Sequence, residues 1–344
     1  PTFCGIPLKT LSLVTLAIQN STLAIVMHYS RVSRPPSRTY SAATAVLMNE
    51  ILKGTISLAI AFARIDPQQL SNESAQAPYA PPRPLVQTFV ARVRKLWREI
   101  MSPDCWKLSI PAILYVIQNN LQYIAASNLE AATFQVTYQM KILTTAGFSV
   151  LLLRKSLLPS QWISLLFLSI GVGIVQFQTG IDNHGSVGGD TSIGLHTMNP
   201  VKGFVAVVSA CFTSGLAGVY FEMVLKNSQA DLWVRNVQLS LFSLLPALAP
   251  IMFTHSTQPG QSLLSVLFDN FGAWAWSTVF VQVLGGLVTA MVIKYSDNIL
   301  KGFATSLSIV LSFLASVALF DFQMSVTFIL GSTVVLMATW LYNQ

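Results

Sequence analysis

Lys141 is the residue in this sequence whose type and surroundings most directly imply a ligand. It lies midway along an apolar segment, 130–153, with no acidic residue three or four positions away on either side. An ionised group in the middle of a membrane helix costs at least about 2.5 kcal/mol. A buried ammonium without an acidic neighbour in its own helix therefore predicts an anion from elsewhere, most simply the phosphate of a substrate. An ion pair with Glu50 across the bundle is the alternative.

A second basic group lies near the C-terminal end, where Lys301 follows Asn298 and precedes Gly302. Lys301 falls in the first turn of a predicted helix, 299–320, so its charge lies beside the positive end of the helix dipole. That position suits a bound phosphate and is unfavourable without one. Lysines at such a junction also occur as ordinary interfacial anchors, and this alternative stays open.

Two further polar sets lie on predicted helices. Tyr115, Asn119 and Gln122 share one face of the third helix. They offer an aromatic ring and amides of the kind that stack on a nucleobase and bind its edge, although amides also hold membrane helices together. Glu50 and Lys53 are three residues apart on the second helix, where they can neutralise each other or take part in a pocket.

The sequence lacks the residue patterns of common enzymatic sites. No DxD motif, Walker loop, HExxH or GxSxG occurs, and the chain has only 13 acidic residues. The 3 cysteines form no CxxC pair, so neither a disulfide framework nor a zinc site is expected. We therefore expect a protein that is not an enzyme and uses no cofactor or metal. It would move a solute by exchange or along a gradient rather than with ATP.

These residues must be positioned by membrane helices. Hydrophobic residues make up 53% of the chain and charged residues 10%, against about 25% charged in an average soluble domain. The basic residues lie between apolar segments rather than in one stripe with aromatics, which argues against nucleic acid as a partner. Ten segments have the length of about 20 residues that crosses a bilayer. They are 8–30, 41–63, 108–127, 130–153, 160–178, 201–226, 234–253, 272–295, 299–320 and 324–342.

The ten segments divide into two sets of five. A helix pair joined by a short loop, 130–178, has a counterpart at 299–342, and a Ser-Asn or Ser-Asp-Asn step precedes each pair. Two five-helix repeats insert with opposite orientations, the architecture on which alternating access is commonly built. We thus predict an all-α membrane protein with an inverted repeat at 8–178 and 201–342, joined by a lumenal loop at 179–200.

The distribution of basic residues predicts the orientation. With a cytosolic N-terminus, most of the 20 Lys and Arg face the cytosol, as do the C-terminus and a long loop at 64–107. Residues 89–100 in that loop are either an amphipathic helix on anionic membrane lipids or a solvated linker. The sequon at Asn72 then receives no glycan. The oligomeric state, a homodimer included, stays open.

Three motifs resemble those of the nucleotide-sugar transporter family of the Golgi. The first runs over 118–123 (QNNLQY), 128–132 (NLEAA) and 135–144 (QVTYQMKILT). The second is 294–303 (KYSDNILKGF), and the third is 218–222 (GVYFE) with 233–238 (WVRNVQ). The resemblance implies the ten-helix drug/metabolite-transporter fold in a multi-pass Golgi membrane protein. It also implies antiport of a nucleotide sugar against the matching nucleoside monophosphate.

The resemblance carries over to single residues by position. It implies that Lys141 and Lys301 bind phosphate and that Glu50 and Lys53 match an acid-base pair of the second helix. We expect Asn298, next to this second lysine, to take part in binding. The residues that fall where the family forms its nucleotide pocket are Tyr115, Asn119, Asn120, Tyr138 and Tyr220.

The motifs also bear on the solute. GDP-mannose carriers show FYNN and GALNK, whereas this chain has VIQNN and ILKG, which favours a pyrimidine over guanine. Residues 302–312 resemble UDP-galactose and UDP-N-acetylglucosamine carriers more than CMP-sialic acid carriers, and the long loops resemble fungal UDP-galactose transporters. We therefore predict exchange of UDP-galactose for UMP. The alternatives are UDP-N-acetylglucosamine or CMP-sialic acid transport, another solute in the same fold, and a scaffold without transport activity.

Overall fold

A computed structural model describes residues 2–3, 6–33, 38–65, 85–185, 198–226, 231–254, 267–295, 298–320 and 325–342. Over these ranges the chain is helical apart from a hairpin of two short strands, β1 (Thr2–Phe3) and β2 (Ile6–Pro7). The helices are α1 (Leu8–Val32), α2 (Ala42–Arg64), α4 (Leu85–Ile100), η2 (Cys105–Leu108), α5 (Ser109–Asn128), α6 (Ala131–Thr137), η3 (Tyr138–Met140), α7 (Lys141–Leu153), α8 (Pro159–Gly185), α9 (Pro200–Lys226), α10 (Leu232–Thr254), α12 (Ala273–Tyr295), α13 (Asn298–Phe320) and α14 (Val326–Tyr342).

Each of the ten predicted segments coincides with a helical segment of the described chain. The ends differ by a few residues, and the largest difference is at α8, which continues to Gly185 beyond its predicted end at 178. The predicted helix at 130–153 contains one 3-10 turn, η3, between α6 and α7. The loop predicted at 64–107 contains α4. The Asn72 sequon lies outside the described residues.

Several of these helices are long and apolar enough to cross a membrane. Four segments within the described residues meet both criteria: Ala42–Arg64, Ala131–Leu153, Pro200–Val224 and Leu232–Met252. A fifth results if the bent pair Val86–Ile100 and Cys105–Asn128, whose directions differ by 64°, counts as one span. Length and composition thus support a membrane protein built from helices.

Local sequence explains several helix ends. The Ser41 side chain accepts a hydrogen bond from the Thr44 backbone N–H and so caps the start of α2. Pro159 occupies the first position of α8, where its missing N–H costs no hydrogen bond. Arg154 ends α7 in the left-handed conformation, with φ of 52°, which turns the chain sharply toward α8. The short connection expected between these two helices is therefore confirmed.

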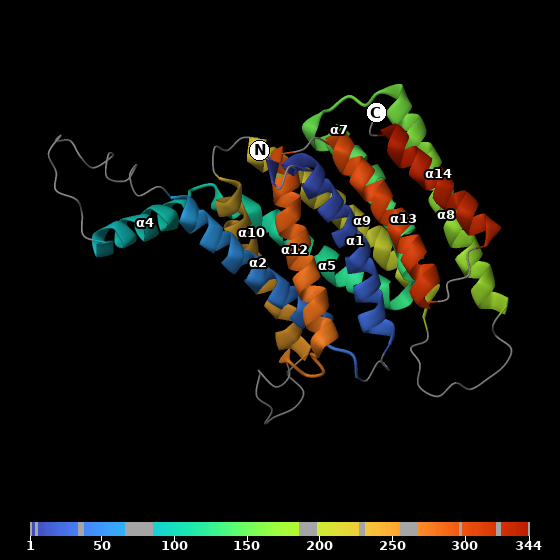
Figure 1. Ribbon diagram of the computed structural model, residues 1–344, viewed down its shortest axis with the longest axis horizontal. Helices are drawn as coiled ribbons and strands as arrows, with labels where there is room; N and C mark the ends of the chain where they lie inside the picture. The colour runs from blue at the N-terminus through green and yellow to red at the C-terminus, as the bar shows by residue number, and fades with distance from the viewer. Residues whose placement is uncertain are drawn as a thin grey trace.

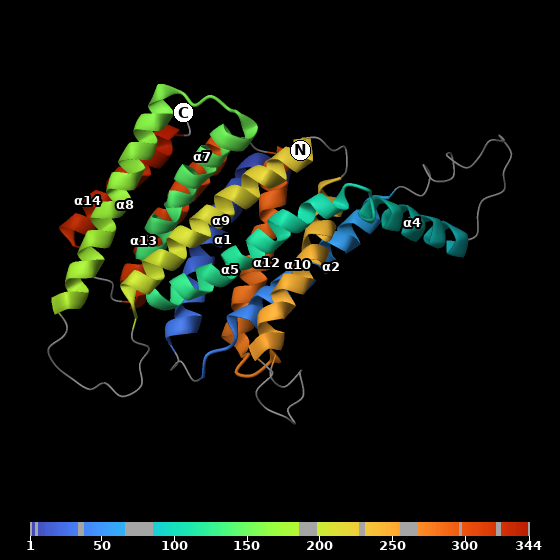
Figure 2. The ribbon, with the colours of Figure 1, turned by 180° about the vertical axis from the view of Figure 1, so that it is seen from behind.

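The helices pack in a regular set of pairs. α1 packs against α12 and α13, and α9 packs against α5 and α7. α2 contacts α12 and α10, and α10 also contacts α5. α8 and α14 lie side by side at one edge of the molecule, with α2 and α10 toward the other (Figures 1 and 2). α1 begins and α14 ends at the same end of the bundle (Figure 1).

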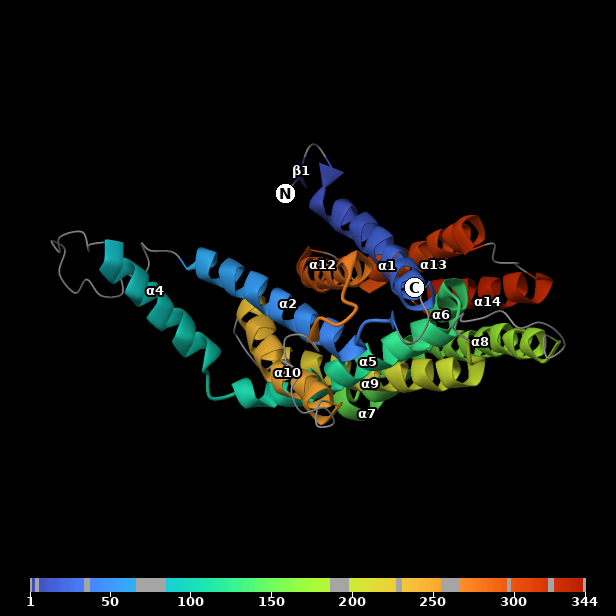
Figure 3. The same ribbon diagram turned by 90° about the horizontal axis from the view of Figure 1, so that it is seen from below.

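Two buried apolar clusters fill the two sides of the bundle. The first joins α1, α2, α5, α10 and α12, and includes Val46, Tyr123 and Val279. The second joins α6, α8, α13 and α14, and includes Val172 and Val335. The η3 turn lies where the second cluster meets a smaller one formed by α1, α5, α6 and α9. α4 projects from the α2 and α10 edge, as the view from below shows (Figure 3).

Candidate substrate-binding site

The predicted phosphate-binding lysine lies over an aromatic ring at the 3-10 turn η3, between α6 and α7. The ammonium nitrogen of Lys141 is 4.8 Å from the centroid of the Tyr138 ring. A cation over the face of an aromatic ring is attracted by the negative charge on that face. The lysine follows the turn directly, as the first residue of α7. Lys141 and Tyr138, both predicted as site residues, are therefore brought together.

The Tyr138 ring is held from two sides. Its hydroxyl oxygen accepts hydrogen bonds from Nε2 of Gln118, at 2.9 Å, and from Nε2 of Gln122, at 2.6 Å. The ring stacks on Phe134 one turn earlier, with centroids 5.6 Å apart and an interplanar angle of 15°. Within the described residues, the buried Oε1 of Gln118 has no hydrogen-bond partner. An acceptor is thus left beside the aromatic stack.

The same turn packs closely against α9. Thr144 Oγ1 donates a hydrogen bond to the Cys211 carbonyl at 2.7 Å, and the Cys211 thiol donates to the Tyr138 carbonyl at 3.5 Å. Gly215 allows the approach, because a Cβ added there would lie 2.6 Å from Thr144 Oγ1 and 2.9 Å from its backbone carbon. Lys141 is therefore on a segment that α9 holds in place.

The acid-base pair of the second helix forms as predicted. Glu50 Oε1 accepts from Lys53 Nζ at 2.7 Å and from the Asn49 side chain at 3.1 Å. The Glu50 side chain is only 1% exposed, and its second oxygen has no hydrogen-bond partner among the described residues. The Lys53 side chain packs against Gly286 of α12. A Cβ added at Gly286 would lie 3.3 Å from the Lys53 Cδ. Glu50 thus neutralises Lys53 rather than Lys141.

Comparison with known proteins decides the family. The sequence profile described as "Nucleotide-sugar transporter" matches residues 5–343. The chain belongs to the nucleotide-sugar transporter family. It is 42% identical to the UDP-galactose transporter of Schizosaccharomyces pombe over 341 residues, which cover 99% of this chain and 89% of that protein. It is 44% identical to the UDP-galactose translocator of Homo sapiens, over 98% of this chain and 77% of that protein.

A related specificity is also found among these relatives. The UDP-N-acetylglucosamine transporter of Homo sapiens is 39% identical over 341 residues, which cover 98% of this chain and 95% of that protein. The family and these relatives are transporters and not enzymes, as the absence of catalytic motifs in the sequence predicted. Two sequence motifs that resemble those of this family, 118–123 and 135–144, meet where Gln118 and Gln122 bind the Tyr138 hydroxyl.

Not every predicted site residue of this nucleotide-sugar transporter joins that cluster. Asn120 donates its side-chain hydrogen bond to the Val116 carbonyl of its own helix, at 2.9 Å. Tyr115 and Asn119 lie partly buried on α5, and Tyr220 lies partly buried on α9. The amides of α5 that hydrogen-bond to the Tyr138 hydroxyl are those of its glutamines, Gln118 and Gln122. In the sequence, Gln118 and Gln122 lie one helical turn apart in an apolar segment. Because a buried amide is costly without a hydrogen-bond partner, this pair indicates a polar group on the facing helix.

For the motif that contains Lys301, the structure gives the position of the helix backbone alone. Asn298 is the first residue of α13, and Lys301 lies in its first turn, as predicted. Both side chains lie outside the described residues. α13 packs against α6 and α1. At this contact Gln135 Nε2 of α6 donates to Ser312 Oγ of α13 at 3.2 Å.

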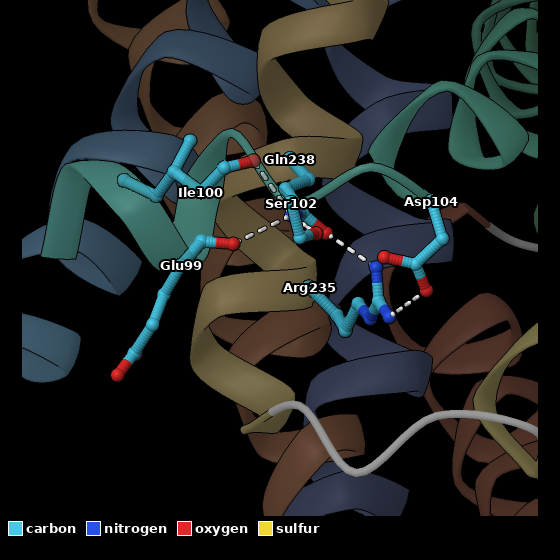
Figure 4. A network of polar contacts seen from close by, with 6 residues as sticks. All are labelled: Glu99, Ile100, Ser102, Asp104, Arg235 and Gln238. Carbon is cyan, nitrogen blue, oxygen red and sulfur yellow. Dashed lines mark hydrogen bonds and ion pairs between the residues drawn. The ribbon is translucent and has the colours of Figure 1, made fainter. Parts of the chain in front are cut away.

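The third family motif ties α10 to the connection between α4 and α5 (Figure 4). Arg235 is 1% exposed, and its Nη2 lies 2.6 Å from Asp104 Oδ2. Its Nη1 donates to Gln238 Oε1 at 2.9 Å, and Gln238 Nε2 donates in turn to the Ile100 carbonyl at 2.7 Å and to Ser102 Oγ at 3.1 Å. These bonds satisfy carbonyl groups at the end of α4. The motif therefore fixes a helix junction.

Proposed function

We propose that this protein is an antiporter that imports UDP-galactose into the Golgi lumen in exchange for UMP. It would act as a multi-pass membrane protein with ten spans and cytosolic termini. The relatives named UDP-galactose transporter or translocator, which align over nearly the whole chain, support this solute. Alternating access would carry the nucleotide past a site near the middle of the bilayer.

The observation that carries the proposal is the position of Lys141 over Tyr138. An aromatic face attracts and orients an ammonium group, and the N–H groups of an ammonium are suited to binding a phosphate. In the low dielectric of a membrane protein, that charge attraction is stronger than in water. Lys301, in the first turn of α13, would supply a second positive charge for a diphosphate.

The amides beside Tyr138 suit the base of the nucleotide. Uracil presents a donor N–H between two carbonyl acceptors, and an amide offers both a donor and an acceptor. The Gln118 Oε1 atom is an acceptor that no described residue satisfies. It could accept the uracil N–H while the base stacks near the Phe134 and Tyr138 rings.

The packing pattern supports an inverted repeat. If α1 corresponds to α9, α2 to α10, α5 to α12, and the α6–α7 segment to α13, the contact of α1 with α12 has its counterpart in α9 with α5. Likewise α1 with α13 corresponds to α9 with α7, and α2 with α12 to α10 with α5. Two repeats whose corresponding helices make equivalent contacts across their interface can rock about a shared axis.

Exchange in proteoliposomes tests the proposal. Vesicles loaded with UMP should accumulate labelled UDP-galactose, and empty vesicles should not. Lys141→Ala and Lys301→Ala should each abolish uptake, whereas Lys202→Ala, at an exposed position at the start of α9, should leave it unchanged. Wild-type exchange by both of the first two variants would contradict phosphate binding by these lysines.

A second solute is favoured by one observation. UDP-N-acetylglucosamine transporters align over the same length of chain, at 39% identity. Competition of unlabelled UDP-galactose, UDP-N-acetylglucosamine, CMP-sialic acid and GDP-mannose against labelled UMP exchange separates these solutes. A scaffold without transport activity would also show no thermal stabilisation by UMP, because a ligand that binds only the folded protein raises its stability.

A further inference from the structure

The amphipathic helix α4 uses only part of its apolar face to pack on the protein. Leu96 and Ile100 are buried in one cluster with Ile65, at the end of α2, and with Trp233 and Val237 of α10. This cluster fixes one side of α4 against the two helices. The helix is therefore a docked element and not a solvated linker, one of the two interpretations that its sequence allowed.

A basic residue reinforces the docking. Arg92 Nη2 donates a hydrogen bond to the Phe62 carbonyl at 2.7 Å, and its guanidinium carbon lies 4.3 Å from the centroid of the Phe62 ring. Phe62 also meets Phe89 edge to face, with ring centroids 5.5 Å apart. Cations near the last carbonyls of a helix are stabilising, so Arg92 suits the end of α2.

The rest of the apolar face is exposed. Val86 is 73% exposed and Trp97 is 62% exposed, and Val90, Val93 and Met101 are exposed as well. These positions are three or four residues apart and so form one continuous stripe along the helix. A helix with a stripe of this kind and a basic opposite face is typical of segments that lie at a membrane surface.

Two arginines border this stripe. Arg94 follows Val90 by four residues and precedes Trp97 by three, and Arg98 precedes Met101 by three, so each lies next to the stripe. Both arginines are exposed, and neither forms an ion pair within the described part of the chain. They present two positive charges where a lipid phosphate would lie if the stripe entered the bilayer.

A groove lies between α4 and the outward faces of α2 and α10, and part of the stripe lines it. It has a volume of about 640 Å³ and is lined almost wholly by apolar side chains, among them Phe62, Val93, Trp97 and Leu241. The outward faces of α2 and α10 continue from it as exposed apolar surface, for example at Leu245. Both helices have the length and composition of membrane spans. A hydrocarbon chain from the surrounding lipid fits such a groove better than any polar ligand does.

The direction of α4 agrees with a place at the membrane surface. α4 differs by 64° from the direction of the η2–α5 segment that follows it. In Figure 1, α4 extends sideways from the bundle near the end where α1 begins and α14 ends. With α5 across the bilayer, α4 lies much closer to the membrane plane, on the side assigned above to the cytosol.

We propose that α4 and this groove form a binding site for an anionic phospholipid of the cytosolic leaflet. One acyl chain occupies the groove between α2, α4 and α10, and the phosphate lies beside Arg94 and Arg98. The cytosolic leaflet is the one that carries anionic lipids, so the charges of lipid and helix are complementary. This site is separate from the nucleotide site, and it rests on the proposed function only for the spans of α2 and α10 and for the cytosolic orientation of this end.

Quenching of Trp97 by brominated lipid tests the proposal on the full chain in nanodiscs. The emission of wild type minus that of Trp97→Phe reports this residue alone. Bromine on the acyl chains of phosphatidylserine, mixed into phosphatidylcholine, should quench Trp97 at a lower lipid fraction than bromine on phosphatidylcholine itself. Arg94→Gln and Arg98→Gln should each reduce this preference by about fivefold.

Two controls test whether the preference depends on the arginines of α4 and on the acyl chain of the lipid. Lys202→Gln removes an exposed charge at the start of α9 and should leave the preference unchanged. Inorganic phosphate should not reproduce the effect of phosphatidylserine, because it brings no acyl chain. If Trp97 is not quenched by either brominated lipid, the groove holds no acyl chain and the proposal is wrong. Equal quenching by the two lipids would overturn the anionic specificity.

Discussion

Lys141 and Tyr138 form a cation–π pair, with the ammonium 4.8 Å from the ring centroid. The pair joins three helices, because the Tyr138 hydroxyl is bound by amides of α5 and its segment packs on α9. Movement of α5 or α9 would therefore shift the lysine that is proposed to bind phosphate. Coupling of a charge to helices of both proposed repeats suits the alternating access proposed for this protein.

The ring and the hydroxyl of Tyr138 have separable roles. Tyr138→Phe keeps the ring but removes the acceptor for Gln118 and Gln122, which should cost about 1 kcal/mol of stability for each lost hydrogen bond. Tyr138→Leu also removes the cation–π contact, so nucleotide exchange should fall by a further factor of about ten. Proteoliposome exchange and thermal unfolding measure the two effects. Equal exchange by both variants would show that the ring does not position Lys141.

The close contact of α7 and α9 predicts a sensitive glycine. Gly215→Ala places a Cβ 2.6 Å from Thr144 Oγ1, so the two helices must separate. Overpacking of this kind costs about 1 to 3 kcal/mol, and the shift should reduce exchange because Thr144 is one turn from Lys141. Gly218→Ala is the matched control, since nothing lies within 4 Å of a Cβ there. Equal losses in both variants would argue against the packing explanation.

Much of the fold could be predicted because each helix needs an apolar run of bilayer length. The runs located ten helical segments of the described chain to within a few residues, except at the end of α8, but they missed α4, which lies in the predicted loop at 64–107. At the end of α8 the polar residues 179–185 read as a loop, yet the helix continues to Gly185. Extending an existing helix costs far less than starting one, so weak helix formers can follow a long apolar segment.

The candidate site was predictable only in part. A lysine in the middle of an apolar segment, with no acidic residue three or four positions away, identified Lys141 from the sequence, and spacing alone identified the Glu50 and Lys53 pair. Which amides of α5 face Tyr138 depends on how α5 is rotated against α6, and no local rule fixes that rotation. Asn120 binds its own helix, whereas Gln122 reaches across.

The proposed orientation predicts that Asn72 carries no glycan. The sequon Asn72-Glu73-Ser74 lies in the loop assigned to the cytosol, where the glycosylation machinery does not act. Expression in eukaryotic cells followed by glycosidase treatment should give no mobility shift. Asp190→Asn creates a sequon in the loop assigned to the lumen and should give a shift. A shift in the wild-type protein would reverse the orientation.

The ion pair of Asp104 with Arg235 predicts a pH dependence of stability. The hydrogen bond from Arg235 lowers the pKa of Asp104 below its ordinary value of 3.8. A carboxyl whose pKa is lower in the folded state stabilises the protein fully above its unfolded-state pKa and loses that contribution as the pH falls through the folded-state pKa. The melting temperature in detergent should therefore decrease below about pH 4.

Asp104→Asn separates this pair from other acid-sensitive groups. The variant leaves the buried Arg235 charge without its anion, which should cost about 1 to 2 kcal/mol at neutral pH, a moderate value because Asp104 is 35% exposed. As the pH falls below about 4, the wild type loses the same contribution, so the two melting temperatures should converge. Glu99→Gln is the matched control, because only the backbone carbonyl of Glu99 joins the network. A constant difference between wild type and Asp104→Asn across this range would mean that the pair does not control the response to acid.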